Sequence, residues 1–275
     1  MPVDSLKDAL HLMRSSPALW LLGVVFGALG TLNLLLQLGG ESQMERFTVL
    51  QLLVIPFFIA GGLYAVHRTP GSISGFLEGG RKYYTRILLA TLVIVFAAIL
   101  TILLLTATMA ILGMGADTGM LFMIPMGVAV PVLCFTYFYD TAIVVEERRI
   151  LDSIRRSVEF VFLKPIRTLA FFILNMAILL IFALLSSFFW AILLAERLEP
   201  LISINETALQ PIPMNDLLKS LGIWEIGGIA FVWFAALTFG VTFLYAYKFS
   251  FFRRYSKEEA PAYGEYDEKG RWYRY

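Results

Sequence analysis

The chain has 275 residues, of which 59% are hydrophobic and only 16% are charged. A soluble fold of this composition would have too little polar surface to cover itself, which excludes an ordinary soluble globular protein. The formal net charge of +1 lacks the basic excess of a nucleic-acid-binding protein. The single cysteine, Cys134, excludes an intramolecular disulfide, a cysteine zinc site and a CxxC redox motif.

Six apolar stretches are long enough to cross the hydrocarbon core of a bilayer, which needs about 20 residues of α-helix. In chain order they are 17–38, 48–67, 87–113, 119–146, 168–195 and 222–248. The third and fifth exceed the thickness of the core, so we expect those helices to tilt or to extend past the interface. Pro56, Pro125 and Pro131 lie inside the second and fourth stretches and predict kinks there.

The distribution of Lys and Arg predicts the orientation, because short loops rich in these residues stay on the cytoplasmic side. With the N-terminus inside, 19 of the 22 Lys and Arg residues are cytoplasmic, and only Arg46, Arg197 and Lys219 are outside. The first stretch is long and lacks a small-residue cleavage site, so we interpret it as an uncleaved anchor. We expect a multi-pass protein of the plasma membrane with both termini in the cytoplasm.

A short amphipathic segment precedes each odd-numbered span. These segments are 4–14, 72–84 and 150–162, and each has apolar residues at helical spacing on one face and charges on the other. A helix of this kind lies in the headgroup plane, so we expect three cytoplasmic interfacial helices, which we call elbow helices. The predicted fold class is therefore all-α, a polytopic transmembrane bundle of six helices with three elbow helices.

The unit of elbow helix, outward span and inward span occurs three times. Because each unit has an even number of spans, the copies would be parallel, related by a pseudo-threefold axis along the membrane normal. The other interpretation is that any hairpin entering a bilayer shows this pattern, since sequence identity between the units is slight. Residues 1–252 form the predicted transmembrane domain. Residues 253–275 form a cytoplasmic aromatic and charged tail, which is either disordered or folds back to dock a partner.

Residues suited to chemistry are few within the predicted spans. Asp140, at the cytoplasmic end of the fourth span, is the charge nearest to a midplane, and we favour an interface residue paired with a nearby Arg over a coupling site. His11 and His67 belong to no metal-binding motif, and a pair of His67 with Asp140 would lack a nucleophile or a metal cluster. We therefore expect no catalytic, metal-binding or cofactor-binding residues and no enzyme activity.

The cytoplasmic surface around the third elbow helix is strongly basic. Each cation near such a surface gains about 1 kcal/mol from anionic lipid. Two interpretations are open: the cluster is only the orientation signal, or it is a lipid-headgroup site with Arg155 and Arg156 as phosphate ligands. We call the whole set the basic rim; its members are Arg148, Arg149, Arg155, Arg156, Lys164 and Arg167.

Asn205 begins an Asn-Glu-Thr triplet, the sequon for N-glycosylation, in the loop assigned to the outside. Such triplets also arise by chance, so Asn205 is a candidate acceptor. Its predicted position outside the membrane is consistent with that modification.

Two segments resemble a known family. The run DTAIVVEE from Asp140, followed by ILDSIRRS from Ile150, resembles the signature D-x-A-I-V-x-E, then D-(S/A)-(I/L)-(R/K)-R-S, of uncharacterised archaeal multi-span proteins. Those proteins are similar in turn to the membrane domain attached to some bacterial glycerophosphodiester phosphodiesterases. Residues 76–84 also resemble their second elbow, so the likeness covers residues 5 to about 190. The resemblance implies a helical membrane module, without the soluble phosphodiesterase domain that would carry catalysis.

These patterns predict a non-enzymatic integral membrane module, a scaffold or accessory subunit. We expect it to bind membrane lipids or protein partners at its cytoplasmic face and not to bind nucleic acid. The alternative is a transporter or lipid translocator with a cavity between the three hairpins. A polar cavity reaching the midplane would favour transport, whereas a core filled by Leu, Phe and Gly contacts would favour a scaffold.

Overall fold

The computed structural model describes residues 2–38, 44–69, 72–111, 118–208, 222–256, 264–266 and 272–274. Its helices are α1 (Pro2–Ser15), α2 (Pro17–Leu38), α3 (Met44–Arg68), α4 (Ile73–Ile111), α5 (Thr118–Thr136), α6 (Tyr139–Val145), α7 (Ile150–Leu163), α8 (Pro165–Ala208) and α10 (Ile223–Ser256). Two short antiparallel strands follow, β1 (Gly264–Tyr266) and β2 (Trp272–Arg274).

Six segments of helix are long and apolar enough to cross a membrane, as the sequence predicted. They are Pro17–Leu38, Phe47–Arg68, Ile73–Ile111, Met123–Val145, Pro165–Ala195 and Ile223–Ser256. Helices satisfy their own backbone hydrogen bonds, which is the requirement for crossing lipid. The chain is therefore a multi-pass membrane protein.

The fourth of these segments is interrupted between α5 and α6. Two prolines lie inside α5, yet the helix continues past both and ends at Thr136. There the hydroxyl of Ser157 in α7 accepts a hydrogen bond from the Phe138 amide (3.0 Å) and donates one to the Phe135 carbonyl (2.8 Å). Ser157 thus supplies partners for backbone groups at the break, which makes irregular backbone tolerable inside a membrane protein.

Two of the three segments expected to be elbow helices are separate helices. α1 and α7 end just before Pro17 and Pro165, each of which begins the next long helix. Segment 72–84 instead forms the first turns of α4, which continues without a break to Ile111. The second unit has no proline at the matching place, so nothing stops the helix there. A position in the headgroup plane and the threefold repeat stay predictions.

Glycines allow the closest contacts between helices. A Cβ added to Gly79 of α4 would overlap the side chain of Tyr64 in α3. One added to Gly23 of α2 would overlap the Thr242 hydroxyl and the Thr238 carbonyl of α10. Helices in lipid associate mainly by such close packing, since there is no water to expel. The pairs α3 with α4 and α2 with α10 are therefore fixed by backbone proximity.

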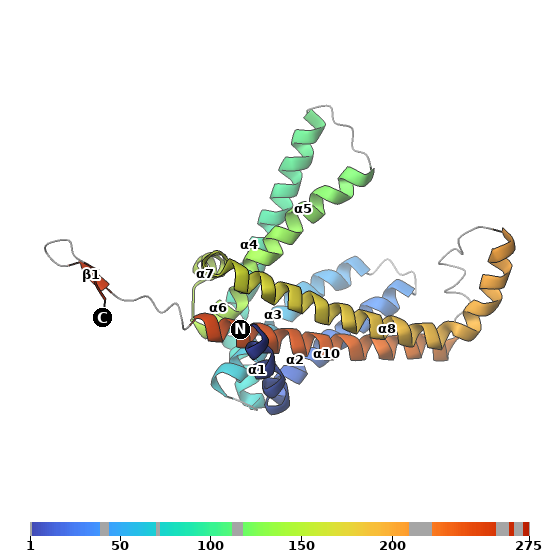
Figure 1. The fold of residues 1–275 in the computed structure, drawn as a ribbon, viewed down its shortest axis with the longest axis horizontal. Helices are drawn as coiled ribbons and strands as arrows, with labels where there is room; N and C mark the ends of the chain where they lie inside the picture. Colours follow the sequence, from blue (N-terminus) through green and yellow to red (C-terminus); the bar gives the residue numbers. More distant parts are fainter. Residues whose placement is uncertain are drawn as a thin grey trace.

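The hairpins converge at one end of the molecule and separate at the other (Figure 1). The convergent region, which we call the junction, comprises α1, α6, α7, residues 73–90 of α4 and residues 243–256 of α10. From there the α4 and α5 hairpin points away from α8 and α10 (Figure 1). Its outer part is exposed, as at Phe96 (69%) and Leu104 (61%), so lipid is the natural cover for those surfaces.

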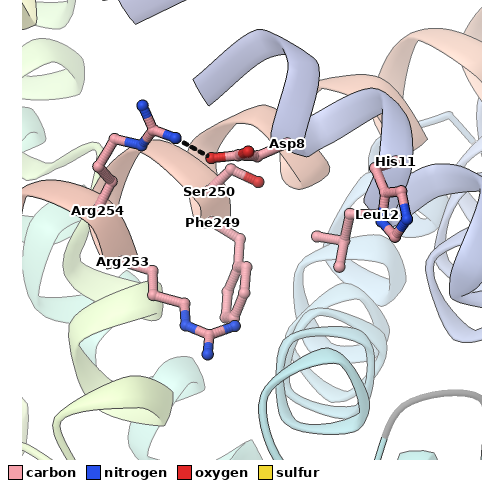
Figure 2. A pocket seen from close by; sticks show the side chains of 7 residues that line it. All are labelled: Asp8, His11, Leu12, Phe249, Ser250, Arg253 and Arg254. Atoms are coloured by element: carbon pink, nitrogen blue, oxygen red, sulfur yellow. Dashed lines mark hydrogen bonds and ion pairs between the residues drawn. The ribbon is translucent and has the colours of Figure 1, made fainter. Parts of the chain in front are cut away.

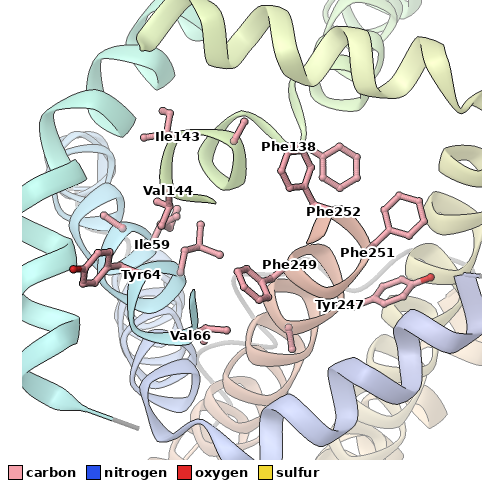
Figure 3. Close-up of a cluster of buried hydrophobic side chains, with 14 of the residues drawn as sticks. Ile59, Tyr64, Val66, Phe138, Ile143, Val144, Tyr247, Phe249, Phe251 and Phe252 are labelled. Atoms are coloured by element: carbon pink, nitrogen blue, oxygen red, sulfur yellow. The ribbon is translucent and has the colours of Figure 1, made fainter. Parts of the chain in front are cut away.

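The buried core lies in the junction and in the adjoining parts of α2, α3 and α8, and it is rich in aromatic side chains (Figure 3). Phe138 stands next to Phe160 of α7 and Phe251 of α10, with ring centroids 4.9 and 5.9 Å apart. Phe171 of α8 stacks on Tyr247 of α10 at 4.6 Å. Each such pair contributes about 0.5 to 1.5 kcal/mol beyond the burial of its area. The rings therefore join α7, α8 and α10 to the residue that precedes α6 in one packed unit.

Replacing Gly23 with alanine should loosen the contact between α2 and α10. The added methyl group would overlap Thr242 and the carbonyl of Thr238, and overpacking of this kind costs about 1 to 3 kcal/mol. We expect detergent-solubilised Gly23→Ala to unfold at a lower temperature than the wild type. Gly240→Ala is the matched control, because nothing lies within 4 Å of its added Cβ. Equal destabilisation by the two changes would show that close approach at Gly23 is unimportant.

Candidate functional site: a buried ion pair and a basic rim

A buried ion pair joins α6 to α10. The ammonium of Lys248 lies 2.6 Å from Oδ1 and 2.7 Å from Oδ2 of Asp140, and the two side chains are 6% and 2% exposed. The prediction that Asp140 pairs with a nearby Arg is therefore wrong. Its partner is a lysine 108 residues away in the sequence. The pair brings together two elements that no local pattern connects.

Both charges have further favourable contacts. The backbone amide of Thr141 donates a hydrogen bond of 2.6 Å to Asp140 Oδ1, and the Thr141 hydroxyl donates another of 3.2 Å. The Lys248 ammonium lies 4.6 Å from the ring centre of Tyr137 and 5.0 Å from that of Tyr245. Additional hydrogen bonds and cation–π contacts are what a buried ion pair needs to offset the loss of water.

Polar groups of α4 and α8 reach the same region. The Tyr137 hydroxyl accepts a hydrogen bond of 3.1 Å from the buried side-chain amide of Asn175 in α8. The Tyr139 hydroxyl shares a hydrogen bond of 2.7 Å with Thr91 in α4. The ion pair therefore lies where helices from the second and third hairpins meet, surrounded by groups that fix the neighbouring rings.

Glu147, in the loop after α6, binds donors from α3 and α4. Its carboxylate accepts hydrogen bonds from the Tyr83 hydroxyl (2.9 Å) and Lys82 (3.2 Å), and Arg68 lies 3.5 Å away. The hydrogen bond from Tyr83, followed by that from Lys82, holds the pKa of Glu147 below its ordinary value. Its φ of 53° is left-handed, a conformation that costs free energy for a residue other than glycine. The three partners keep the loop in this conformation.

Glu146 forms ion pairs with two members of the basic rim. It lies 3.1 Å from the Arg156 guanidinium and 3.2 Å from that of Arg148. The Arg156 side chain is only 13% exposed, so its charge serves an ion pair that links α7 to the end of α6. The two candidate phosphate ligands, Arg155 and Arg156, therefore differ: Arg156 is engaged in an ion pair within the protein.

Two other members of the basic rim, one just before α8 and one in its first turn, contact the end of α10. Lys164 donates a hydrogen bond of 2.7 Å to the Tyr255 carbonyl. The Arg167 guanidinium lies 4.9 Å from the ring centre of the same tyrosine. The carbonyls in the last turn of a helix have no partner within it, and a cation there is favourable. These contacts are structural.

The exposed face of α7 is both cationic and apolar. The Arg155 side chain is 80% exposed and meets Glu159 one turn later at 2.7 Å, and Arg149 is exposed at the start of the helix. Large apolar side chains on or beside the same helix are exposed as well, namely Leu151 (68%), Phe162 (64%) and Leu163 (64%). Ser157 and Phe160 on the other face are buried. Exposed apolar groups beside cations are typical of a helix at a membrane interface.

Two predicted features lie at the edge of what the structure describes. Asn205 falls within the backbone of α8, where a loop had been expected, and its side chain is outside the described residues. The first residues of the predicted tail, 253–256, belong to α10. Of the remaining tail, the structure describes only the two paired strands.

Lys248 is the functional residue that sequence reasoning misplaced. The predicted sixth span ended at this lysine, which was counted among the cytoplasmic charges. α10 instead continues to Ser256 and carries Lys248 inside the core. The signal was present, because Phe249, Phe251 and Phe252 continue the apolar pattern beyond the charge. A lysine followed by aromatic residues is better interpreted as an internal charge that needs a partner.

The fold and this site define a polytopic α-helical membrane protein with a buried ion pair where its hairpins meet. A family model described as a domain of unknown function, DUF7847, matches residues 2–255, and the chain belongs to this family. Searches of curated proteins and of solved structures find no match to the chain. Nothing in the family match links the chain to the membrane domains of glycerophosphodiester phosphodiesterases, so that resemblance stays a prediction.

Removing either charge of the ion pair alone should be strongly destabilising. Asp140→Asn leaves a buried ammonium without its counterion, and Lys248→Met leaves a buried carboxylate, so each should cost about 3 to 5 kcal/mol. The double variant should recover most of this loss, because no uncompensated charge remains. A double-mutant cycle on the free energy of unfolding in detergent measures the coupling.

The exposed pair of Arg155 with Glu159 is the control for that cycle. Its side chains are 80% and 44% exposed, so Glu159→Gln should change the free energy of unfolding by less than about 1 kcal/mol. Additive losses for Asp140→Asn and Lys248→Met would mean that the two charges do not interact.

Acidification should weaken the contacts of Glu147. Because the pKa of this carboxyl in the folded protein lies below its ordinary value of 4.5, the ionised form stabilises the fold above that pH. The contribution is lost as the pH falls through the folded-state pKa. Glu147→Gln should therefore flatten the decline in melting temperature between about pH 5 and pH 3. Equal slopes for variant and wild type would contradict the assignment.

Glu147→Gly distinguishes the effect of losing the carboxylate from the effect of relieving backbone strain. It should share the flatter acid profile of Glu147→Gln, because both lack the carboxyl group. It should also be more stable than that variant by about 1 kcal/mol, since glycine adopts a positive φ without strain.

Proposed function

We propose that this protein is a non-enzymatic membrane module that binds anionic lipid headgroups through the exposed face of α7. In this role it acts as a scaffold or accessory subunit at the cytoplasmic side of the plasma membrane. The observation that carries the proposal is the combination on α7 of the exposed Arg155 with the exposed Leu151 and Phe162. Arg149, at the start of the helix, supplies a second accessible cation.

Support for a fixed lipid-binding surface comes from the way α7 is held. Ser157 bonds the backbone at the break before α6, and Arg156 pairs with Glu146. Phe160 is buried among the rings of the junction. With its inner face anchored, α7 can present its cations without a large ordering cost, which favours binding.

The proposed orientation rests on charge. The cytoplasmic leaflet carries anionic lipid and attracts basic segments, and Lys and Arg in short loops favour that side. α7, the residues that flank it and the first turn of α8 together carry the whole basic rim. Placing the junction at the cytoplasmic leaflet puts these cations next to anionic headgroups.

A lipid translocator is the second candidate, and the divergence of the α4 and α5 hairpin from α8 and α10 is the observation in its favour (Figure 1). Two pockets flank the contact between α8 and α10, and their linings are apolar apart from a few groups such as Ser186 and Ser187. The core of the junction is filled by aromatic rings. These features suit lipid tails and packed helices better than a polar substrate, so the module is the preferred function.

Replacing Arg149 and Arg155 together with Gln should reduce the anionic lipid that stays bound through purification. Each cation gains about 1 kcal/mol at an anionic surface, so the pair should weaken retention on the order of 30-fold. Native mass spectrometry of protein in nanodiscs containing phosphatidylglycerol and phosphatidylcholine measures the change. Retention of phosphatidylcholine should stay the same.

Arg156→Gln is the control, because it removes one cation from the position next to Arg155. That side chain is 13% exposed and paired with Glu146, so the variant should lower the melting temperature and leave lipid retention unchanged. A loss of phosphatidylglycerol of about 5-fold from Arg156→Gln, as expected for any one cation, would mean that the effect depends on net charge. No loss from the double variant would remove the proposal.

A further inference from the structure

A pocket of about 470 Å³ opens between α1 and the end of α10 (Figure 2). Its lining combines cations, hydrogen-bond donors and apolar groups, namely Asp8, His11, Leu12, Phe249, Ser250, Arg253 and Arg254. The volume is within the range of about 300 to 1,000 Å³ that is usual for small-molecule sites. None of these residues belongs to α7 or to the basic rim.

The charges of the lining leave one guanidinium available. Arg254 lies 2.7 Å from the Asp8 carboxylate and 3.3 Å from that of Asp4, so its charge is neutralised. Arg253 is exposed and forms no ion pair with any residue that the structure describes. Figure 2 shows the Arg253 side chain beside Phe249 on the side of the pocket opposite His11. The pocket therefore offers a fork of N–H donors that no carboxylate of the described residues fills.

We propose that this pocket binds a phosphate ester group. Arg253 would form paired hydrogen bonds with two phosphate oxygens, the geometry that a guanidinium suits best. His11 and Ser250 line the same space and supply further donors. Leu12 and Phe249 would contact the organic part of the ligand. The site lies apart from α7, so it goes beyond the lipid-binding surface proposed above.

Two sources could supply this chemistry. One is the headgroup of a phospholipid with a terminal phosphate, such as phosphatidic acid, since α1 is amphipathic and adjoins the first span. The other is a soluble phosphate ester with no lipid tail. The two differ in one respect that can be measured, because only the lipid gains affinity from its acyl chains.

Binding to the purified full-length protein in detergent tests the proposal, with dioctanoyl phosphatidic acid and glycerol 3-phosphate as probes. We expect at least one probe to bind, and Arg253→Gln to weaken that binding at least 10-fold. Arg81→Gln, an exposed arginine on α4, is the matched control and should change affinity less than about twofold. Tighter binding of the phosphatidic acid identifies a lipid headgroup, and equal binding identifies a soluble ester.

A second variant should act in the opposite direction. Asp8→Asn removes a carboxylate from the lining and frees part of Arg254, so it should tighten binding several-fold. A variant that merely unfolded could not produce that gain. The proposal is overturned if neither probe binds, or if binding is indifferent to both Arg253→Gln and Asp8→Asn.

Discussion

The buried pair of Asp140 and Lys248 is the constraint on which the junction depends. An isolated charge in a membrane span costs several kcal/mol, so each of these residues is acceptable only while the other is within contact distance. Because 108 residues separate them, the pair fixes α6, in the second hairpin, against α10, in the third. The contacts of Phe138 with Phe251 and Phe252 of α10 share this placement.

The aromatic core and the break before α6 follow from the same placement. When α10 brings Lys248 to Asp140, it also brings Phe251 and Phe252 against Phe138. Phe138 can lie there because the helix is interrupted beside it, and Ser157 of α7 compensates the interruption. The break before α6, α7 and α10 are therefore interdependent at this end. Along the outer part of α4, none of residues 92–111 is buried, and these side chains present apolar surface to lipid.

The sequence revealed the spans because hydropathy is a local property that the bilayer imposes on every crossing helix. It could not reveal how the charged residues within the spans are paired, because a partner such as Lys248 is close to Asp140 in space and distant in sequence. The prolines did not locate the break either, because α5 continues past Pro131 and ends where a side chain from another helix offers hydrogen bonds. Segment 72–84 had the amphipathic pattern of a separate helix but nothing to stop it, so it merged with α4.

The candidate site was partly predictable for a similar reason. The basic rim was evident as a run of charge, but its members have different roles that depend on nearby glutamates. Arg155 and Arg156 are adjacent in sequence, yet one is 80% exposed and the other 13%. Only the packing of α7 distinguishes the accessible cation from the structural one. The pocket beside Arg253 was invisible to pattern analysis, since its walls come from the two ends of the transmembrane domain.

Hydrogen–deuterium exchange of wild type and Asp140→Asn in nanodiscs tests the central role of the ion pair most directly. If the pair holds the junction together, exchange should rise in α1, α6, α7 and residues 243–256 of α10. The outer part of α4, residues 92–111, should keep its wild-type protection. A uniform rise along all helices, or no change at the junction, would contradict the role assigned to Asp140 and Lys248.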